Sequence, residues 1–181
     1  MDRRTIISVI GEGNARPRIA LLAEQVGAEL ARRGVIVACG GLGGVMEAVC
    51  RGAKSVGGTT IGILPGDNPL SGNDYIDIPI ITGMGYARNT IVAKTGAAVV
   101  AVGGAYGTLS EIGHALGDGM PVIGLETWEL IRGGTPDGGP DYSIIRATDP
   151  ADAAEKAIAA ANQRLADIAA GKSTIPEIYD R

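Results

Sequence analysis

The chain reads VIVACGGLGGVME from Val35 to Glu47. The β-branched apolar run Val35–Ala38 predicts a buried strand, and the residues from Val45 to Val56 predict a helix. The glycines between these two elements permit a sharp turn from strand to helix. A strand, a tight turn and a helix in this order are typical of an α/β protein with a parallel sheet.

The same unit recurs along the 181 residues. Apolar runs predict strands at 5–10, 35–38, 59–64, 97–102, 121–125 and 143–146, and Pro79 limits the stretch 76–80 to a short or edge strand. Helical patterns lie between and after them at 17–34, 45–56, 86–94, 108–116 and 150–169. We therefore expect an α/β fold with a Rossmann-like, doubly wound parallel sheet in a three-layer α/β/α arrangement. The length predicts one domain over residues 1–170, followed by a C-terminal tail at 171–181.

The composition narrows the class of protein. Apolar residues make up 45% of the chain, yet there is no Phe, so the core must be built from Ala, Val, Ile and Leu, which suits a buried parallel sheet. The net charge of −4 provides no basic footprint for nucleic acid. No run approaches the roughly 18 apolar residues of a membrane span, and the apolar start at 6–10 is too short for a signal peptide. We expect a cytoplasmic protein with neither a nucleic-acid nor a membrane partner.

The cysteines and basic side chains indicate no metal or Schiff-base chemistry. Cys39 and Cys50, with His114 as the one histidine, do not form a zinc-ligand pattern. We expect two buried, reduced, structural thiols, a partly buried or interface histidine, no metal site and no cofactor required for folding. None of the lysines lies in an apolar context that would activate it.

Three loops are candidates for a ligand site. In a doubly wound sheet the ligand crevice lies beyond the carboxyl ends of the strands, where the strand order reverses, and unpaired helix amides there bind phosphate. The candidate residues of these loops are Gly11, Gly13 and Asn14, then Gly40, Gly41, Gly43 and Gly44, and then Gly103, Gly104, Tyr106 and Gly107. The alternative is that the glycines only allow close turns. Neither a complete G-x-G-x-x-G nor a P-loop motif is present, which argues against an ordinary dinucleotide site and against ATP hydrolysis of that kind.

Three polar residues beside the glycine loops have two interpretations each. Glu47 either contacts ligand hydroxyl groups or favours its helix by meeting the macrodipole. Thr108 offers a hydroxyl to a phosphate and Glu111 lies one helical turn further on, but Thr-Leu-Ser-Glu is also a capping box, in which Thr108 would cap the helix and Glu111 would reach back.

Arg88 is the candidate cation of the site. It falls near the start of a predicted helix and has no nearby acidic partner in sequence. An arginine in a crevice binds phosphate bidentately, whereas the alternative is a solvated surface arginine. The three loops together with this arginine indicate a site for a phosphorylated, nucleotide-like ligand.

Three segments carry a resemblance to a known family. GGLGGVMEAV at Gly40–Val49, the arginine of GMGYARN at Gly83–Asn89 and GGAYGTLSE at Gly103–Glu111 are similar, in order and spacing, to the Lonely Guy (LOG) superfamily, long labelled "lysine decarboxylase-like". The similarity covers about residues 5–125 and is closest to the bacterial branch that contains molybdenum cofactor carrier proteins. The absence of an activated lysine argues against the decarboxylase activity of the old label.

The resemblance implies two different fates for the ligand. Cytokinin-activating members are phosphoribohydrolases that cleave the N-glycosidic bond of a nucleoside 5′-monophosphate, and their catalytic glutamate and arginine correspond to Glu111 and Arg88. Carrier members bind the molybdenum cofactor, a pterin phosphate, and catalyse nothing. The chain has Arg88-Asn89 where the hydrolases have Arg-Lys, and Val102-Gly103-Gly104 where they have Pro-Gly-Gly.

The sequence is therefore compatible with two functions, a carrier and a hydrolase. The first hypothesis is a protein that binds a phosphorylated nucleotide-like ligand, as a molybdenum cofactor carrier or nucleotide-binding protein. The alternative is a nucleoside 5′-monophosphate phosphoribohydrolase. The family also implies a homo-oligomer, a dimer or tetramer, for which the apolar stretch 76–81 and the helix at 86–94 are candidate surfaces.

Overall fold

The computed structural model describes residues 4–131 and 144–172, which form one seven-stranded sheet flanked by helices. All the strand pairs are parallel, and the order across the sheet is β4-β3-β2-β1-β5-β6-β7. The strands are β1 (Ile6–Gly11), β2 (Ile36–Cys39), β3 (Thr60–Leu64), β4 (Ile78–Ile81), β5 (Val99–Val102), β6 (Val122–Leu125) and β7 (Ile144–Arg146). Because the chain leaves β1 in one direction and returns to its other side as β5, the strand order reverses between β1 and β5.

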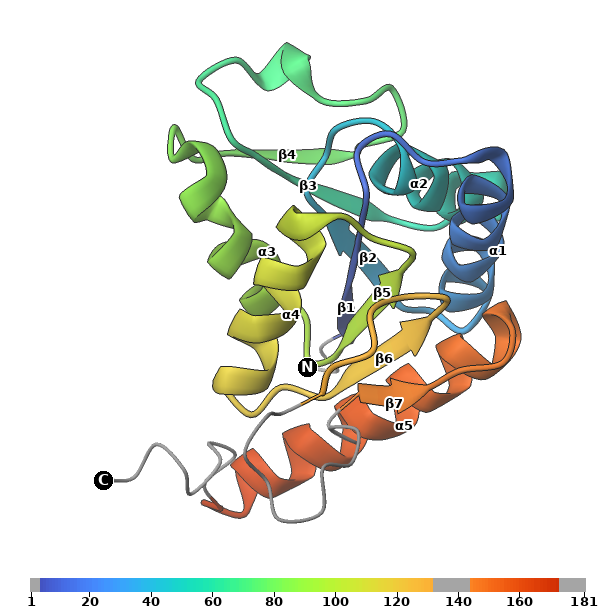
Figure 1. Ribbon diagram of the computed structural model, residues 1–181, viewed down its shortest axis with the longest axis vertical. Helices are drawn as coiled ribbons and strands as arrows, with labels where there is room; N and C mark the ends of the chain where they lie inside the picture. The colour runs from blue at the N-terminus through green and yellow to red at the C-terminus, as the bar shows by residue number, and fades with distance from the viewer. Residues whose placement is uncertain (1–3, 132–143, 173–181) are drawn as a thin grey trace.

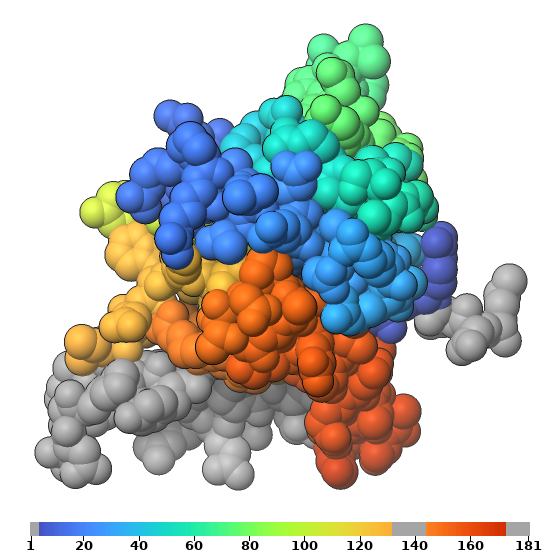
Figure 2. Space-filling view, turned by 90° about the vertical axis from the view of Figure 1, so that its right-hand side faces the viewer, coloured from blue at the N-terminus to red at the C-terminus, as the bar shows by residue number. Residues whose placement is uncertain are grey.

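Five α-helices cover the two faces of the sheet, as Figure 1 shows. They are α1 (Pro17–Arg32), α2 (Val45–Ser55), α3 (Asn89–Thr95), α4 (Tyr106–Gly117) and α5 (Pro150–Ala169), with short 3-10 turns at η1 (Pro69–Ser71) and η2 (Gly85–Arg88). Helices α1, α2 and α5 cover one face, which Figure 2 views with α1 in blue and α5 in orange, and α3 and α4 cover the other. The expected doubly wound, three-layer α/β/α fold is confirmed.

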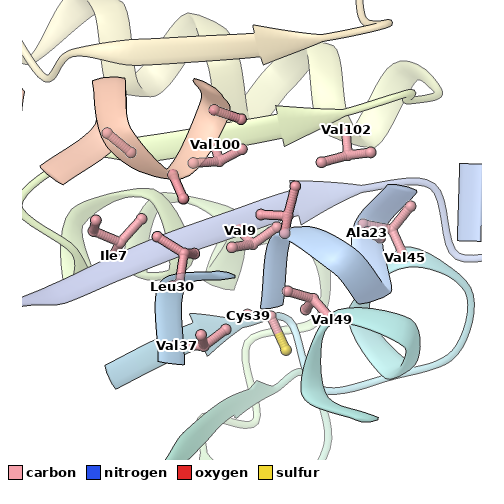
Figure 3. Close-up of a cluster of buried hydrophobic side chains, with 14 of the residues drawn as sticks. Ile7, Val9, Ala23, Leu30, Val37, Cys39, Val45, Val49, Val100 and Val102 are labelled. Atoms are coloured by element: carbon pink, nitrogen blue, oxygen red, sulfur yellow. The ribbon is translucent and has the colours of Figure 1, made fainter. Parts of the chain in front are cut away.

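The core is built from small aliphatic side chains, as the composition predicts. Figure 3 shows the larger cluster, in which Val9 and Val100 of the sheet meet Leu30 of α1 and Val49 of α2. A second cluster joins the opposite face of the sheet to α3 and α4. Both cysteines are free and fully buried, as expected, with Sγ atoms 3.5 Å apart.

Each strand begins one or two residues later than predicted, and two helices also begin at different residues from those expected. The helix expected at 86–94 is divided into the 3-10 turn η2 and the α-helix α3, which starts at Asn89. The helix expected at 108–116 starts two residues earlier, at Tyr106. The proline-containing strand β4 lies at the edge of the sheet, as expected, and pairs only with β3.

Within residues 4–131 and 144–172, every helix is too short or too polar to span a bilayer. Most of the expected tail, from residue 173 onward, lies outside the described residues.

Candidate functional site

A cleft of about 320 Å³ opens at the carboxyl ends of β1 and β5, where the strand order reverses. Six of its lining residues were candidates from the sequence, namely Gly11, Gly13, Arg88, Gly107, Thr108 and Glu111. Six others were not, namely Glu12, Leu42, Met46, Tyr86, Asn89 and Ala105. The fold thus brings residues from the loop after β1, from the first glycine loop and α2, from η2 and α3, and from α4 to one place.

Arg88 and Glu111 meet in the wall of this cleft. Both are buried, with 7% and 6% of their surface exposed, and Arg88 Nη1 lies 3.6 Å from Glu111 Oε1. Arg88 Nη1 donates to Asn89 Oδ1 at 2.6 Å, and Nη2 donates to the carbonyl oxygen of Gly40 at 3.2 Å. Among the described residues, nothing accepts a hydrogen bond from the buried Arg88 Nε. The interpretation of Arg88 as a solvated surface arginine is therefore wrong.

The Glu111 carboxyl titrates near neutral pH. Burial raises its pKa from an ordinary 4.5 to about 7, because the charged form loses its hydration. The Arg88 guanidinium pulls that pKa back down, but only in part, since the 3.6 Å separation exceeds a hydrogen bond. Burial also lowers the pKa of Arg88, which remains a cation because a guanidinium does not lose its proton in proteins.

The second glycine loop presents free amides to the cleft. Helix α4 begins at Tyr106 after the N-cap residue Ala105, and its first backbone hydrogen bond runs from Leu109 N to Ala105 O at 3.0 Å. The amides of Tyr106, Gly107 and Thr108 therefore have no partner within the helix. This loop carries the unpaired amides that the sequence predicts at a strand-to-helix turn.

The capping-box interpretation of Thr108 and Glu111 is wrong. Thr108 is the third residue of α4 rather than its N-cap, and no side chain caps this helix. The reason is that Gly103 and Gly104, with φ of +58° and +130°, turn the chain early enough for the helix to start at Tyr106. The side chains of Thr108 and Glu111 are then free to line the cleft.

The first glycine loop, Gly40–Gly44, packs against the loop that follows β1. Gly44, with φ of +65°, caps α2, and a Cβ there would lie 2.3 Å from the carbonyl oxygen of Glu12. That same carbonyl accepts a hydrogen bond from the first amide of α2, that of Val45, at 3.0 Å. Gly40, Gly41, Gly43 and Gly44 do not line the cleft, so the structure supports the alternative in which these glycines allow a close turn. Gly40 contributes indirectly, through its carbonyl bond to Arg88.

Five other candidates lie beside the cleft rather than in its wall. Gly103 and Gly104 shape the turn, and the amide of Gly104 donates to Glu12 Oε2 at 3.2 Å. Glu47 lies 3.8 Å from Arg51, which favours its structural interpretation. Asn14 and Tyr106 are exposed, and the Tyr106 ring is 5.8 Å from that of Trp128.

The residues that sequence reasoning missed were close to residues that it found. Glu12 stands between Gly11 and Gly13, Tyr86 stands in the GMGYARN segment, and Asn89 follows Arg88. In the sequence, Asn89 differs from the Arg-Lys pair of the hydrolases, but nothing near it indicates that its side chain lines a cleft. No local signal shows that Leu42 and Met46 reach the cleft, because their approach to α3 and α4 depends on the packing of the whole sheet.

Fold and cleft together define a Rossmann-like α/β protein whose candidate site lies at the topological switch point of its sheet. The chain belongs to the SLOG cluster4 family, whose model matches residues 4–158. The resemblance to the Lonely Guy superfamily, with its molybdenum cofactor carrier proteins, is confirmed.

Relatives that are more than 30% identical and have a stated activity or ligand include two kinds. The molybdenum cofactor binding protein of Rippkaea orientalis is 34% identical, with a TM-score of 0.76 over 87% of this chain and 97% of that chain. The molybdenum cofactor carrier protein of Chlamydomonas reinhardtii is 36% identical, with a TM-score of 0.71 over 91% of this chain and 99% of that one. A cytokinin riboside 5′-monophosphate phosphoribohydrolase from Mycobacterium tuberculosis is 32% identical over 117 residues, which are 59% of this chain and 62% of the relative.

Proposed function

We propose that this protein binds a phosphorylated, nucleotide-like small molecule in the cleft and acts as a carrier of the molybdenum cofactor type. The observation that carries the proposal is the free N-terminus of α4. The amides of Tyr106, Gly107 and Thr108 have no helical partners, and Gly107 and Thr108 line the same cleft as the buried cation Arg88. A helix N-terminus with a nearby arginine favours an anion such as a phosphate group.

The residues present fit a pterin phosphate as cargo. The cleft volume of about 320 Å³ is at the lower end of the range of about 300–1,000 Å³ for small-molecule sites. The α4 amides and the Thr108 hydroxyl would hold the phosphate, and Arg88 would supply positive charge. The likeness to proteins described as binding or carrying this cofactor supports the same choice.

Asn89 favours binding over chemistry. Its side-chain oxygen accepts a hydrogen bond from Arg88 Nη1 at 2.6 Å, so one arm of the guanidinium is already held by the protein. Residue 89 is therefore not a second cation beside Arg88. The phosphoribohydrolases of the Lonely Guy superfamily have a lysine at this position. The cleft is therefore better suited to holding a ligand in place than to stabilising the charge of a transition state.

The binding test uses two valine substitutions. The wild-type protein, purified from a host that makes the molybdenum cofactor, is expected to contain molybdenum and pterin. It is also expected to gain thermal stability with ribose 5-phosphate or guanosine 5′-monophosphate, because a ligand of the native state raises its stability.

Thr108→Val removes a hydroxyl from the cleft and is expected to weaken the binding of phosphorylated ligands about tenfold, as the loss of a hydrogen bond to a charged group would. Thr95→Val makes the same change in α3, where the hydroxyl bonds to the carbonyl of Ile91 outside the cleft, and should leave binding unchanged. A protein free of molybdenum and pterin, whose stability no phosphorylated ligand changes, would overturn the proposal.

The second candidate function is a phosphoribohydrolase, and the buried Arg88 and Glu111 pair favours it. A carboxyl group with a pKa of about 7 in a cleft is a frequent property of catalytic sites. In this reaction water adds to C1′ of a nucleoside 5′-monophosphate, the N-glycosidic bond breaks, and the products are a protonated free base and ribose 5-phosphate. Ionised Glu111 would stabilise the positive charge that develops on the ribose.

Chromatography of a panel of purine and pyrimidine 5′-monophosphates after incubation tests this second candidate. A hydrolase releases free base and ribose 5-phosphate, and Glu111→Gln abolishes the release. A folded protein that binds nucleotides but releases no base from any member of the panel would leave the carrier as the function.

The homo-oligomer is part of the same proposal. Strand β4 is a sheet edge, and its Ile78, Ile80 and Ile81 are 38–47% exposed. Large apolar side chains that are exposed in a single chain often lie at contacts between copies of that chain. Light scattering after size-exclusion chromatography is expected to give the mass of a dimer or tetramer of the 18.4 kDa chain. A mass of one chain at micromolar concentration would contradict it.

A further inference from the structure

A second, smaller cavity adjoins the cleft. It has a volume of about 210 Å³ and is lined by Leu42, Pro65, Gly85, Tyr86 and Arg88. Three of these residues, Leu42, Tyr86 and Arg88, also line the main cleft, so the two spaces are neighbours that meet at Arg88. The small size suits a part of a ligand rather than a whole one, since sites for whole ligands start at about 300 Å³.

The chemistry of this side cavity differs from that of the main cleft. The side cavity shares Leu42, Tyr86 and Arg88 with the main cleft and adds Pro65 and Gly85. It lacks the α4 residues of the main cleft, with their free amides, the Thr108 hydroxyl and the Glu111 carboxyl. Its one charged group is Arg88, whose planar guanidinium can lie against an aromatic ring. A phosphate or a sugar would find few partners here. A flat, mostly apolar group with a polar edge would fit.

Tyr86 has no aromatic partner among the described residues and exposes 91% of its surface. It follows Gly85, whose φ of +55° and open surroundings place the tyrosine backbone on a turn just before α3. Figure 1 shows that this turn precedes a helix lying beside α4, which carries the phosphate-binding amides of the proposed function. The ring is therefore free to cover a group that enters the side cavity.

We propose that the side cavity binds the planar heterocyclic ring of the ligand, a bicyclic purine or pterin, and that Tyr86 stacks on this ring and determines the preference for it. The proposal rests on the proposed function, because the phosphate held at α4 is what directs the ring past Arg88 into the side cavity. It goes further by assigning separate places to the two ends of the ligand.

The chain offers a control for Tyr86 outside the site. Leu70 is also strongly exposed, at 88%, and lies in the 3-10 turn η1, as Tyr86 lies in the 3-10 turn η2. Its side chain lines neither cavity. A general effect of removing a large exposed side chain would appear at both positions, whereas stacking on a ligand ring would appear only at Tyr86.

The experiment compares the affinities of two probes, ribose 5-phosphate and guanosine 5′-monophosphate, which differ by the bicyclic ring. Calorimetry with the full chain is expected to show guanosine 5′-monophosphate binding at least tenfold more tightly to the wild type, in line with base stacking on an aromatic side chain. Tyr86→Ala is expected to remove about tenfold of that preference while leaving the affinity for ribose 5-phosphate unchanged. Tyr86→Phe keeps the ring and should keep the preference, and Leu70→Ala should leave both affinities as they are.

The outcomes separate the two proposals. If neither probe binds the wild type, both the proposed function and this inference fail. If ribose 5-phosphate binds but guanosine 5′-monophosphate binds no better, or if Tyr86→Ala and Leu70→Ala change the preference equally, the proposed function stands and the ring site is overturned.

Discussion

The two glycine loops are alike in sequence and opposite in structure. Each follows a buried strand and precedes a helix at the same edge of the sheet, Gly40–Gly44 before α2 and Gly103–Gly107 before α4. At α2 one of the first three amides, that of Val45, is bonded to the Glu12 carbonyl, and a Cβ on Gly44 would clash with the backbone of Glu12 and Gly13. At α4 the first three amides have no helical partner and two of these residues line the cleft.

The difference teaches how to tell a packing glycine from a ligand-binding one. Glycine content does not separate the two cases, since each loop has two glycines with positive φ. The separating property is whether the first helix amide is already bonded to the protein, as that of Val45 is and, among the described residues, that of Tyr106 is not. The first loop contributes indirectly, because its Gly40 carbonyl accepts a hydrogen bond from the Arg88 side chain. We propose that the second loop contacts the ligand itself.

The largest effect expected from this comparison is on stability. Gly44→Ala places a Cβ 2.3 Å from the Glu12 carbonyl oxygen on a residue with φ of +65° and ψ of −126°. We expect the free energy of unfolding to fall by about 3 kcal/mol or more, since backbone strain and a clash with backbone add together. Urea denaturation monitored by circular dichroism measures it.

Gly107→Ala is the control in the second loop. A Cβ at Gly107 meets nothing within 4 Å, and the residue is helical. The substitution should leave stability unchanged or raise it by up to about 1 kcal/mol, because alanine favours helix over glycine. Equal losses at Gly44 and Gly107 would break the distinction between a packed loop and an open one.

The next effect is the pH dependence caused by Glu111. Burial raises the pKa of its carboxyl from 4.5 to about 7, so between these pH values the folded state binds a proton that the unfolded state has released. The contribution of Glu111 to stability is therefore lost as pH rises from about 4.5 to about 7, by about 2–3 kcal/mol at most. In Glu111→Gln this part of the pH dependence should disappear.

Denaturation of the wild type and of Glu111→Gln at pH 4.5 and pH 8 measures that effect. The wild type should lose more stability than the variant on going to pH 8. A difference between the two proteins that is the same at both pH values would show that the carboxyl does not titrate in this range.

The smallest effect expected is a change in ligand affinity when a negative charge is removed from the cleft. The Glu12 carboxylate lines it and accepts a hydrogen bond from the Gly104 amide at 3.2 Å. Glu12→Gln keeps an acceptor but removes a negative charge that opposes a phosphate, so we expect affinity for ribose 5-phosphate to rise about threefold at low salt. Glu47→Gln, which removes a carboxylate outside the cleft, should leave affinity unchanged in the same titration. Weaker binding by Glu12→Gln would mean that this carboxylate recognises the ligand instead of repelling it.

Local patterns predicted most of the fold. Helix α5 runs from Pro150 to Ala169, as expected, because Asp149 caps it through a bond from the Asp152 amide and proline occupies its first position. The start of α4 was predicted two residues late because the Thr108 and Glu111 pattern resembles a cap. The positive φ angles of Gly103 and Gly104, which start the helix early, are not visible in the residue types alone.

The site was harder to predict because it depends on contacts between distant segments. Arg88 and Glu111 are 23 residues apart, and only the packing of α3 on α4 brings them together, so the sequence alone left Arg88 without an acidic partner. For the same reason the sequence indicated Tyr106, in the segment GGAYGTLSE, but not Tyr86, which lines both cavities.

The most direct test of the central claim is an NMR titration of the backbone amides with ribose 5-phosphate. If the phosphate binds at the open loop, the largest shift changes will be at Tyr106, Gly107 and Thr108, with small changes at Gly41 and Gly44. The largest changes at Gly41–Gly44, with none at residues 106–108, would contradict the assignment of the phosphate site to α4.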